Sequence, residues 1–436
     1  IQEYLAILAS RQRVLDILKT ELLDIKEQFA SPRRTQIEEG DSSMDIEDLI
    51  QREDMVITVS HGGYIKRVPL STYRSQKRGG RGRSGMTIKE EDVVSDIIVA
   101  NTHSPVLFFS TLGKVYQMKV YRLPLGTPQA RGRAMVNLLP LAAGETISTV
   151  LVMPDTFPEG QQPYLIFATS LGNVRRNRLQ DFANILSNGK RAMRLDENEE
   201  LIAVAMCHEG DDIMLSTQKG LCNRFNMTDI RIFSGRDSNG VRGIRLGEGD
   251  RVISMTILSQ GRLNLDERQA YLRQAAKVRQ LANQNEECGG VAEETEEEAT
   301  ALKITPERFR ELEAQEQFIL TITEKGFGKR TSAYEYRTTN RGSQGFAGIT
   351  VNARNGGVVA SFPVQEDNQI ILVTDQGRLM RCPIHDVRIT RRSAQGVIIF
   401  RVNDNEKVVA VSCIPGDDSN QEDNSLQENL EVTPSN

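Results

Sequence analysis

A unit of about fifty residues recurs six times along this chain of 436 residues, and this repeat restricts the possible folds most strongly. Each unit opens with four or five apolar, largely β-branched residues, followed by Ser or Thr, two further residues and Gly. This pattern predicts a buried strand that enters a tight hairpin turn. The turns begin at Ser60, Ser110, Thr169, Thr217, Thr323 and Thr374, and their glycines are Gly63, Gly113, Gly172, Gly220, Gly326 and Gly377. Further strands are expected later in each unit, so we predict a mainly β fold: a propeller-like disc of six four-stranded blades.

Two more residue types recur at fixed distances from the turn glycine. Arg stands four residues after it in five units, at Arg67, Arg176, Arg224, Arg330 and Arg381, whereas the second unit has Gln117. A second glycine follows about nineteen residues after the first, at Gly82, Gly132, Gly189, Gly240, Gly345 and Gly396. The recurring Arg has two interpretations: a salt bridge or stacking contact within each unit, or contact with a polyanion shared by all units.

Charge separates the repeats from the rest of the chain. The net charge of −5 would argue against nucleic-acid binding, but the six repeats (55–258 and 317–414) carry a net +12. The acidic charge lies in residues 1–54, 259–316 and 415–436, with net charges of −6, −5 and −6. Within the first repeat, residues 55–89 contain eight basic residues and no acidic one. A basic body with acidic appendages therefore keeps nucleic acid among the possible partners.

The three acidic segments differ in their expected structure. Apolar residues on one face predict a helix over 1–30 that either packs on a missing domain or forms a coiled coil, and an acidic linker over 31–54 follows it. Because the chain starts at Ile1 within this helical pattern, we expect it to be a fragment. The insertion 259–316 should contain two helices, 266–282 and 306–316, separated by an acidic run. The tail 415–436 is expected to be disordered, either as a solubilising end or as an autoinhibitory mimic of phosphates.

Composition excludes several other classes of protein. The absence of Trp argues against WD-type blades, and no apolar run reaches the roughly 18 residues of a membrane span. The five cysteines form no C-x-x-C pair, which argues against a zinc site or a disulfide framework and is typical of a reducing cytoplasm. The four histidines are dispersed, and neither G-x-S-x-G nor H-E-x-x-H occurs. We therefore expect a binding module with no catalytic residue and no metal site, not an independent enzyme.

The glycine-rich stretch after the first hairpin has three possible interpretations. Gly80, Gly82 and Gly85 match the dinucleotide-binding pattern G-x-G-x-x-G, but a strand-like segment follows where that fold needs a helix. A phosphate-binding P-loop would need Lys at the position of Met86. The third interpretation is a cationic loop whose glycines let the main chain approach a nucleic-acid backbone. Four cations serve it, Lys77, Arg78, Arg81 and Arg83, and no aromatic residue is interleaved to stack on bases.

The same region resembles a known family. Residues 61–70 (HGGYIKRVPL), Tyr73-Arg74 and residues 76–82 are similar to the first blade of the C-terminal domain that bacterial DNA gyrase carries on its A subunit. The last of these segments matches the gyrase A box, Q-[RK]-R-G-G-[RK]-G, a motif that is degenerate in the related topoisomerase IV. In this chain the box residues are Gln76, Lys77, Arg78, Gly79, Gly80, Arg81 and Gly82. The resemblance covers about 1–258 and 317–414, and the insertion departs from the commonest family pattern.

The resemblance implies a fold and a function. The fold is a six-bladed β-pinwheel with strands exchanged between neighbouring blades, preceded by the end of a coiled coil. The function is DNA wrapping around a basic rim, so that an A₂B₂ type II topoisomerase, in which the DNA gyrase B subunit joins two A subunits, introduces negative supercoils with ATP. ATP and Mg²⁺ act through other domains, the catalytic tyrosine lies in the absent N-terminal domain, and the enzyme is cytoplasmic. This chain would then bind double-stranded DNA, with no cofactor of its own and no membrane contact.

Further DNA contacts are expected from loops in later repeats. The candidates are basic residues close to the second glycine of a unit, together with Arg83 in the first: Arg131, Arg133, Lys190, Arg191, Arg242, Arg341, Arg391 and Arg392. An alternative function is a protein-interaction scaffold whose basic rim binds an acidic partner. The salt dependence of DNA binding distinguishes the two, because DNA wrapping releases many counterions.

Overall fold

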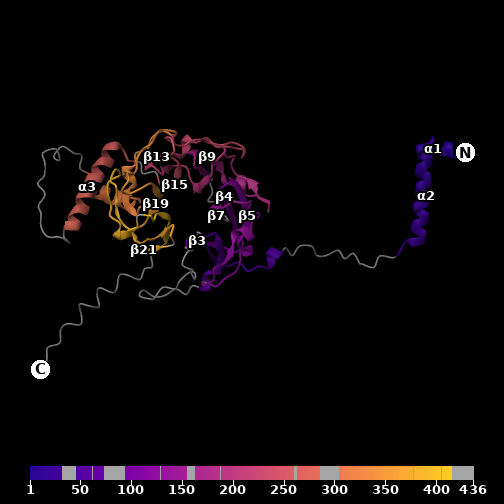
Figure 1. Cartoon of the computed structure of the whole chain (residues 1–436), viewed down its shortest axis with the longest axis horizontal. Helices are drawn as coiled ribbons and strands as arrows, with labels where there is room; N and C mark the ends of the chain where they lie inside the picture. The colour runs from indigo at the N-terminus through magenta and orange to yellow at the C-terminus, as the bar shows by residue number, and fades with distance from the viewer. Residues whose placement is uncertain are drawn as a thin grey trace, which may run out of the picture. The chain divides into compact units, whose positions relative to one another are not determined.

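The computed structural model describes residues 1–31, 46–60, 62–72, 94–127, 129–154, 163–186, 188–259, 263–284, 304–376, 378–403 and 405–414. The chain divides into two compact units, Ile1–Ile50 and Gln51–Asn436 (Figure 1). The gyrase A box, the acidic run Glu286–Glu298 of the insertion and the tail 415–436 lie outside the described residues.

The described part of the N-terminal unit contains two α-helices where the sequence suggested one. Helix α1 spans Gln2–Leu8, α2 spans Arg11–Phe29, and a short 3₁₀ turn spans Ile46–Leu49. Ser10 adopts an extended conformation (φ −120°, ψ 107°) and interrupts the helical hydrogen bonding between them. The expectation of one continuous helix was therefore wrong at Ser10. Most of the apolar side chains on which it rested, among them Leu18, Leu22 and Phe29, are exposed.

The second unit contains six antiparallel sheets, which we name A to F in chain order. Each is built around a hairpin and a third strand. The strands of sheets A to C are β1 Asp54–Ser60, β2 Tyr64–Pro69 and β3 Val94–Asn101; β4 Pro105–Ser110, β5 Lys114–Lys119 and β7 Ile147–Val152; β8 Tyr164–Thr169, β9 Asn173–Arg178 and β11 Leu201–Cys207. Those of sheets D to F are β12 Asp211–Thr217, β13 Leu221–Asn226 and β15 Val252–Ser259; β16 Phe318–Thr323, β17 Phe327–Ser332 and β19 Val358–Val364; β20 Gln369–Thr374, β21 Leu379–Pro383 and β23 Val408–Ile414.

A fourth strand of only two residues comes from the following repeat. It begins directly after the second glycine of that repeat and pairs with the second hairpin strand of the preceding sheet, as in the order β3-β1-β2-β6 of sheet A. These exchanged strands are β6 Arg133–Ala134, β10 Lys190–Arg191, β14 Val241–Arg242, β18 Phe346–Ala347 and β22 Val397–Ile398. Sheet F has three strands among the described residues. The six four-stranded blades and the exchange of strands were both predicted, and sheets A to E confirm the exchange.

The hairpin turns explain the Ser/Thr-x-x-Gly pattern. In the first turn the Gly63 N–H donates to the Ser60 carbonyl at 3.0 Å, and the Ser60 hydroxyl accepts from the Tyr64 N–H at 3.1 Å. Gly63 has φ +77°, the left-handed region that glycine occupies without steric cost. The same pair of hydrogen bonds recurs at Ser110, Thr169 and Thr217. The repeated Ser/Thr and Gly therefore specify one turn geometry in successive blades.

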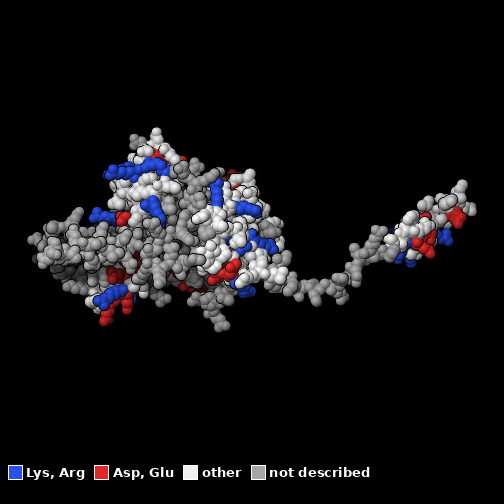
Figure 2. All heavy atoms as spheres, turned by 90° about the horizontal axis from the view of Figure 1, so that it is seen from below, with Lys and Arg blue, Asp and Glu red and all other residues white. Residues whose placement is uncertain are grey.

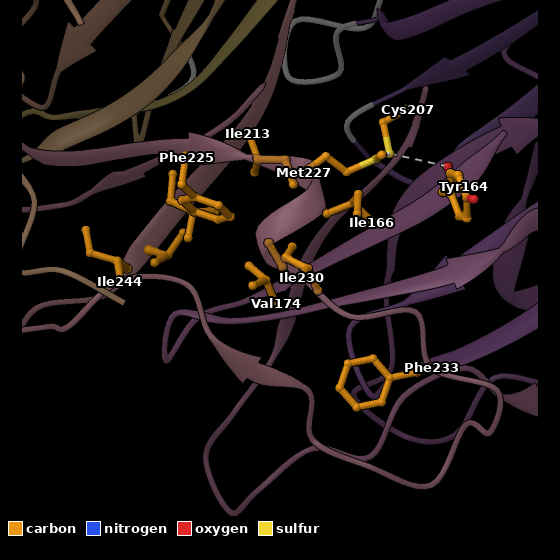
Figure 3. Close-up of a cluster of buried hydrophobic side chains, with 13 residues drawn as sticks. Tyr164, Ile166, Val174, Cys207, Ile213, Phe225, Met227, Ile230, Phe233 and Ile244 are labelled. Atoms are coloured by element: carbon orange, nitrogen blue, oxygen red, sulfur yellow. Dashed lines mark hydrogen bonds between the residues drawn. The ribbon is translucent and has the colours of Figure 1, made fainter. Parts of the chain in front are cut away.

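The sheets pack face to face around a ring. The third strands of neighbouring sheets contact one another from β7 to β23, and β23 contacts β3, which brings the last sheet against the first. The apolar residues between neighbouring sheets form separate clusters, one of which joins sheets C and D (Figure 3). It contains Ile166 and Val174 from sheet C and Ile213 and Phe225 from sheet D, all fully buried. Each blade is thus stabilised by its neighbours, as expected for repeats that cannot bury both sheet faces alone.

The insertion between sheets D and E packs on sheet E. Helix α3 spans Leu265–Gln284 and α4 spans Pro306–Ala314, where the Thr305 side chain caps α4 by accepting from the Arg308 N–H. Tyr271 and Phe309 from the two helices form a buried cluster with Tyr334, which belongs to the 3₁₀ turn Ala333–Glu335 after β17. Among the described residues, no helix is long and apolar enough to cross a membrane.

Candidate nucleic-acid interface

Fold topology places the exchanged strands at one edge of each of the sheets A to E. The third strands, which contact one another around the ring, lie at the opposite edge. We call the exchanged strands β6, β10, β14, β18 and β22, with the loops that lead into them, the rim. All eight predicted secondary contacts from Arg131 to Arg392 lie on the rim, and the box residues and Arg83 lie outside the described residues.

In sheets A to C the exchanged strands themselves carry the cations. Arg133 lies on β6, Lys190 and Arg191 on β10, and Arg242 on β14, and all four are exposed. An edge strand has one side unpaired, so its side chains and backbone are accessible to a large ligand. Lys and Arg form several separate patches on the face shown in Figure 2. Each of three consecutive blades therefore presents positive charge on its exchanged strand.

Two of these rim cations have defined neighbours. The Arg131 guanidinium lies 3.9 Å from the centre of the Tyr64 ring, a cation–π contact that orients the side chain in the loop before β6. Arg191 Nη1 lies 3.3 Å from Asp237 Oδ1 of the next rim loop, and both side chains are exposed. Exposed pairs of this kind are weak, so Arg191 can exchange Asp237 for another anion at little cost.

The rim of sheets D and E is different. Strands β18 and β22 contain no Lys or Arg, and the candidate cations lie in the preceding loops. Arg341 donates to the carbonyls of Asp229 (3.0 Å) and Arg242 (2.6 Å), and Arg392 stacks on Phe346 and donates to the Ala347 carbonyl. Arg391 is exposed. Two of the three predicted contacts in this region thus also bind the protein's own backbone.

The recurring hairpin arginine is buried in sheets C to E, whereas Arg67 is half-buried and Arg381 is exposed. Arg224 Nε lies 2.8 Å from Asp212 Oδ2, and its Nη1 donates to the carbonyls of Ala333 (2.8 Å) and Tyr336 (3.2 Å). Arg330 likewise donates from Nε to the Val387 carbonyl at 2.6 Å. Only 6% of Arg224 and 4% of Arg330 are exposed. The interpretation in which the recurring Arg contacts a shared polyanion is therefore wrong for these residues, because their guanidinium groups anchor the segment that follows the hairpin of the next sheet.

Sequence reasoning missed a second set of buried polar residues. They lie one position earlier, three residues after the turn glycine, on the second hairpin strand: Lys66, Arg175, Asn223 and Lys329. Each donates to main-chain carbonyls of the rim loop on its own sheet. Burial lowers the pKa of Lys329 to about 7 and that of Arg175 to about 10, and it also lowers the pKa of Lys66. A polar residue directly before the recurring Arg in four of the units was the available signal.

Chemically, the described surface is suited to binding and not to catalysis. No group of three or more His, Cys, Asp or Glu side chains within the described ranges could hold a metal ion. The four cysteines in these ranges, Cys207, Cys222, Cys382 and Cys413, are free thiols, and burial raises the pKa of each. What the rim offers is exposed guanidinium and ammonium groups on a rigid scaffold, the groups that bind phosphate.

A family model decides the family of this chain. The model of the DNA gyrase C-terminal domain, a beta-propeller, matches six segments: 54–101, 104–152, 163–208, 211–259, 317–365 and 368–415. The chain belongs to this gyrase domain family. Each matched segment coincides with one of the six repeats, and the insertion lies between the fourth and fifth.

Relatives of this gyrase domain confirm the resemblance drawn from the sequence. The DNA gyrase A subunit of Rickettsia bellii is 48% identical over 99% of this chain, and that of Staphylococcus epidermidis is 36% identical over 96%. These matches cover 47% and 41% of the relatives, so the chain spans less than half the length of these curated proteins.

Solved structures show the same fold. A C-terminal domain of DNA topoisomerase IV superimposes with a TM-score of 0.63 at 18% identity, covering 88% of this chain and all of that domain. A DNA gyrase A C-terminal domain gives a TM-score of 0.54 at 21% identity, covering 83% of this chain and all of that domain. At these identities the comparison concerns the fold alone.

Proposed function

We propose that this chain binds duplex DNA along its rim and bends it around the disc, as the wrapping domain of a DNA gyrase A subunit. The observation that carries the proposal is the row of exposed cations on the exchanged strands β6, β10 and β14. The exchanged strands of successive blades follow the curvature of the ring, so one duplex can meet them in turn. The family of the chain supports the same assignment.

The energetics of bending favour contacts that are spread out in this way. Bending a DNA site of 20–30 base pairs by 40–90° costs roughly 1–6 kcal/mol. Each cation that neutralises a phosphate releases counterions, so several contacts along a curved edge offset this cost. Lys77, Arg78 and Arg81 of the box, with Arg83, serve as the strongest contact at one end of the path. The rim residues from Arg131 to Arg392 extend it.

In the complete enzyme the bound duplex serves strand passage. The chain acts within a cytoplasmic A₂B₂ type II topoisomerase, whose other components are the second A subunit of the pair and the DNA gyrase B subunits. Wrapping presents a DNA segment of one crossing sign to the cleavage site, and ATP-driven passage then introduces negative supercoils. ATP and Mg²⁺ act through other domains, and this chain contributes DNA geometry without a cofactor of its own.

The test replaces Lys77, Arg78 and Arg81 by Ala in the full-length A subunit, which is then reconstituted with the DNA gyrase B subunit. Negative supercoiling of relaxed plasmid should be lost, while ATP-dependent relaxation of supercoiled plasmid survives because the cleavage and ATPase domains are intact. Supercoiling at the unmodified rate would contradict the proposal.

A matched control shows that position matters more than total charge. Replacing Arg11, Arg13 and Lys19 by Ala removes the same charge from α2, outside the pinwheel. In mobility-shift titrations of the 436-residue chain, this control should bind duplex DNA like the unmodified chain. The box variant should bind more weakly at every salt concentration.

A further inference from the structure

We propose that Lys66, Arg175 and Lys329 are positioning residues for DNA wrapping, which fix the backbone of the rim loops so that the exposed cations meet the duplex. This inference rests on the proposed function and deepens it. All three side chains are 0% exposed, so they cannot touch DNA themselves. Their effect on binding must pass through the loops that they hold.

Lys329 donates hydrogen bonds to three main-chain carbonyls. It lies on β17, and its ammonium group donates to the carbonyls of Gly348 (2.9 Å), Arg391 (3.1 Å) and Arg392. An ammonium group has three N–H donors, and each here has an acceptor. Two of these acceptors belong to the rim residues Arg391 and Arg392, in the loop that leads to the exchanged strand β22. The lysine therefore fixes the turn from which the exposed Arg391 projects.

The same connection recurs in sheets A and C. Lys66 on β2 donates to the carbonyls of Thr127 (3.2 Å) and Ala130 (2.9 Å), in the loop that carries Arg131 and leads to Arg133. Arg175 on β9 donates to the Ser238 carbonyl at 3.0 Å, four residues before Arg242. In sheet D the neutral Asn223 on β13 takes this place and donates to the Asn340 carbonyl, next to Arg341.

The fold does not require a cation at this position. Met380 occupies the equivalent place in sheet F, opposite Leu372, as Lys329 lies opposite Thr321 in sheet E. An apolar side chain therefore fits the hairpin, and it avoids the desolvation of a buried charge. A buried ammonium group donates to several carbonyls of one irregular loop at once. Such a loop has no regular backbone hydrogen bonds of its own, so these hydrogen bonds fix its conformation.

The test is a double-mutant cycle on the DNA affinity of the 436-residue chain. Lys329→Met keeps the length of the side chain and removes its donors, and Arg391→Ala removes the exposed cation. We expect Lys329→Met alone to weaken binding by about fivefold and to lower the salt dependence of binding, as when one phosphate is no longer neutralised. In the Arg391→Ala background, the same substitution should weaken binding by less than about twofold.

A purely structural role gives a different result. If Lys329→Met weakens binding equally in both backgrounds and leaves the salt dependence unchanged, the lysine does not act through Arg391 and the inference is wrong. The control Val373→Ala truncates a buried side chain that packs with Ala410 and Ile371. It should lower stability without changing the salt dependence.

One further result tests the DNA path itself, and a second pair of variants tests the positioning role in another sheet. If Arg391→Ala by itself leaves DNA affinity unchanged, this part of the rim does not contact DNA, and the proposed DNA path fails there, and with it the inference for Lys329. If Lys329→Met does not fold, Lys66→Met combined with Arg133→Ala provides the same cycle in sheet A. Additive effects in that cycle would overturn the inference.

Discussion

Two sets of cations in this molecule differ in burial: one is buried and the other is exposed. Among the arginines that recur four residues after a turn glycine, Arg224 and Arg330 are buried and bonded to a carboxylate and to main-chain carbonyls. The cations on the exchanged strands, such as Arg133 and Arg242, do not recur in every repeat and are exposed. At Arg224 and Arg330, recurrence in the repeat therefore reflects packing between blades and not ligand binding. Positions that vary between blades are where a binding surface can be built.

The largest expected effect is on the buried set. Arg224→Met leaves Asp212, of which 1% is exposed, without its guanidinium partner. We expect the free energy of unfolding to fall by about 3–5 kcal/mol, the usual cost of breaking a buried ion pair. Urea unfolding measures this loss, and DNA titration of the folded variant should give nearly unchanged affinity. A stable variant that has lost DNA binding would reverse the comparison.

The exposed set should show the opposite behaviour. Replacing Arg133, Lys190 and Arg242 by Ala should weaken DNA binding by about a hundredfold at low salt, and the slope of log K against log salt should fall by about 0.9 for each phosphate that is no longer neutralised. Because all three side chains are exposed, the free energy of unfolding should change by less than about 1 kcal/mol. Affinity and salt slope equal to those of the unmodified chain would exclude these strands from the DNA path.

The lowered pKa of Lys329 makes the stability of the unmodified chain relative to Lys329→Met depend on pH. Its folded pKa of about 7 lies below the ordinary value of 10.5. Between these pH values the unfolded chain holds a proton that the folded chain has released. The stability of the unmodified chain relative to Lys329→Met should therefore rise with pH above about 7, by up to about 1.4 kcal/mol per unit, and be flat below. Urea midpoints at several pH values measure it, and a flat difference up to pH 10 would contradict it.

The smallest effect concerns the exposed pair Arg191 and Asp237. A double-mutant cycle on unfolding should give a coupling of about 0–1 kcal/mol, since both side chains are well exposed. Asp237→Asn should raise DNA affinity slightly, by about twofold, because it removes an anion beside a phosphate-binding cation. A large loss of stability in this variant would instead place the pair with the structural set.

The sequence was sufficient for the fold because the repeat encodes it locally. Ser60 and Gly63 define a turn that depends on one hydroxyl and one left-handed residue, and both are visible without the structure. The partners of Lys329 were not visible, because Arg391 and Arg392 lie more than sixty residues away and meet it only through strand exchange. The stacking of Arg392 on Phe346 is likewise a contact between segments that are distant in the sequence.

The interruption at Ser10 and the double role of Arg341 also escaped the sequence. Ser is common both within and before helices, so its extended conformation here is not written in the apolar pattern. Arg341 lies near a second glycine as the other candidates do, but its guanidinium bonds the neighbouring rim loop at Arg242. The residue type and position predicted an exposed cation, and the packing of adjacent loops decided otherwise.

The most direct test of the wrapping rim is the ligation of nicked DNA circles in the presence of the 436-residue chain, followed by measurement of their linking number. A duplex that bends around the disc should give topoisomers displaced in one direction, and the displacement should shrink in the Arg133, Lys190 and Arg242 variant. If the topoisomer distribution matches that of protein-free circles under conditions where the DNA is saturated, the chain binds DNA without wrapping it and the account is wrong.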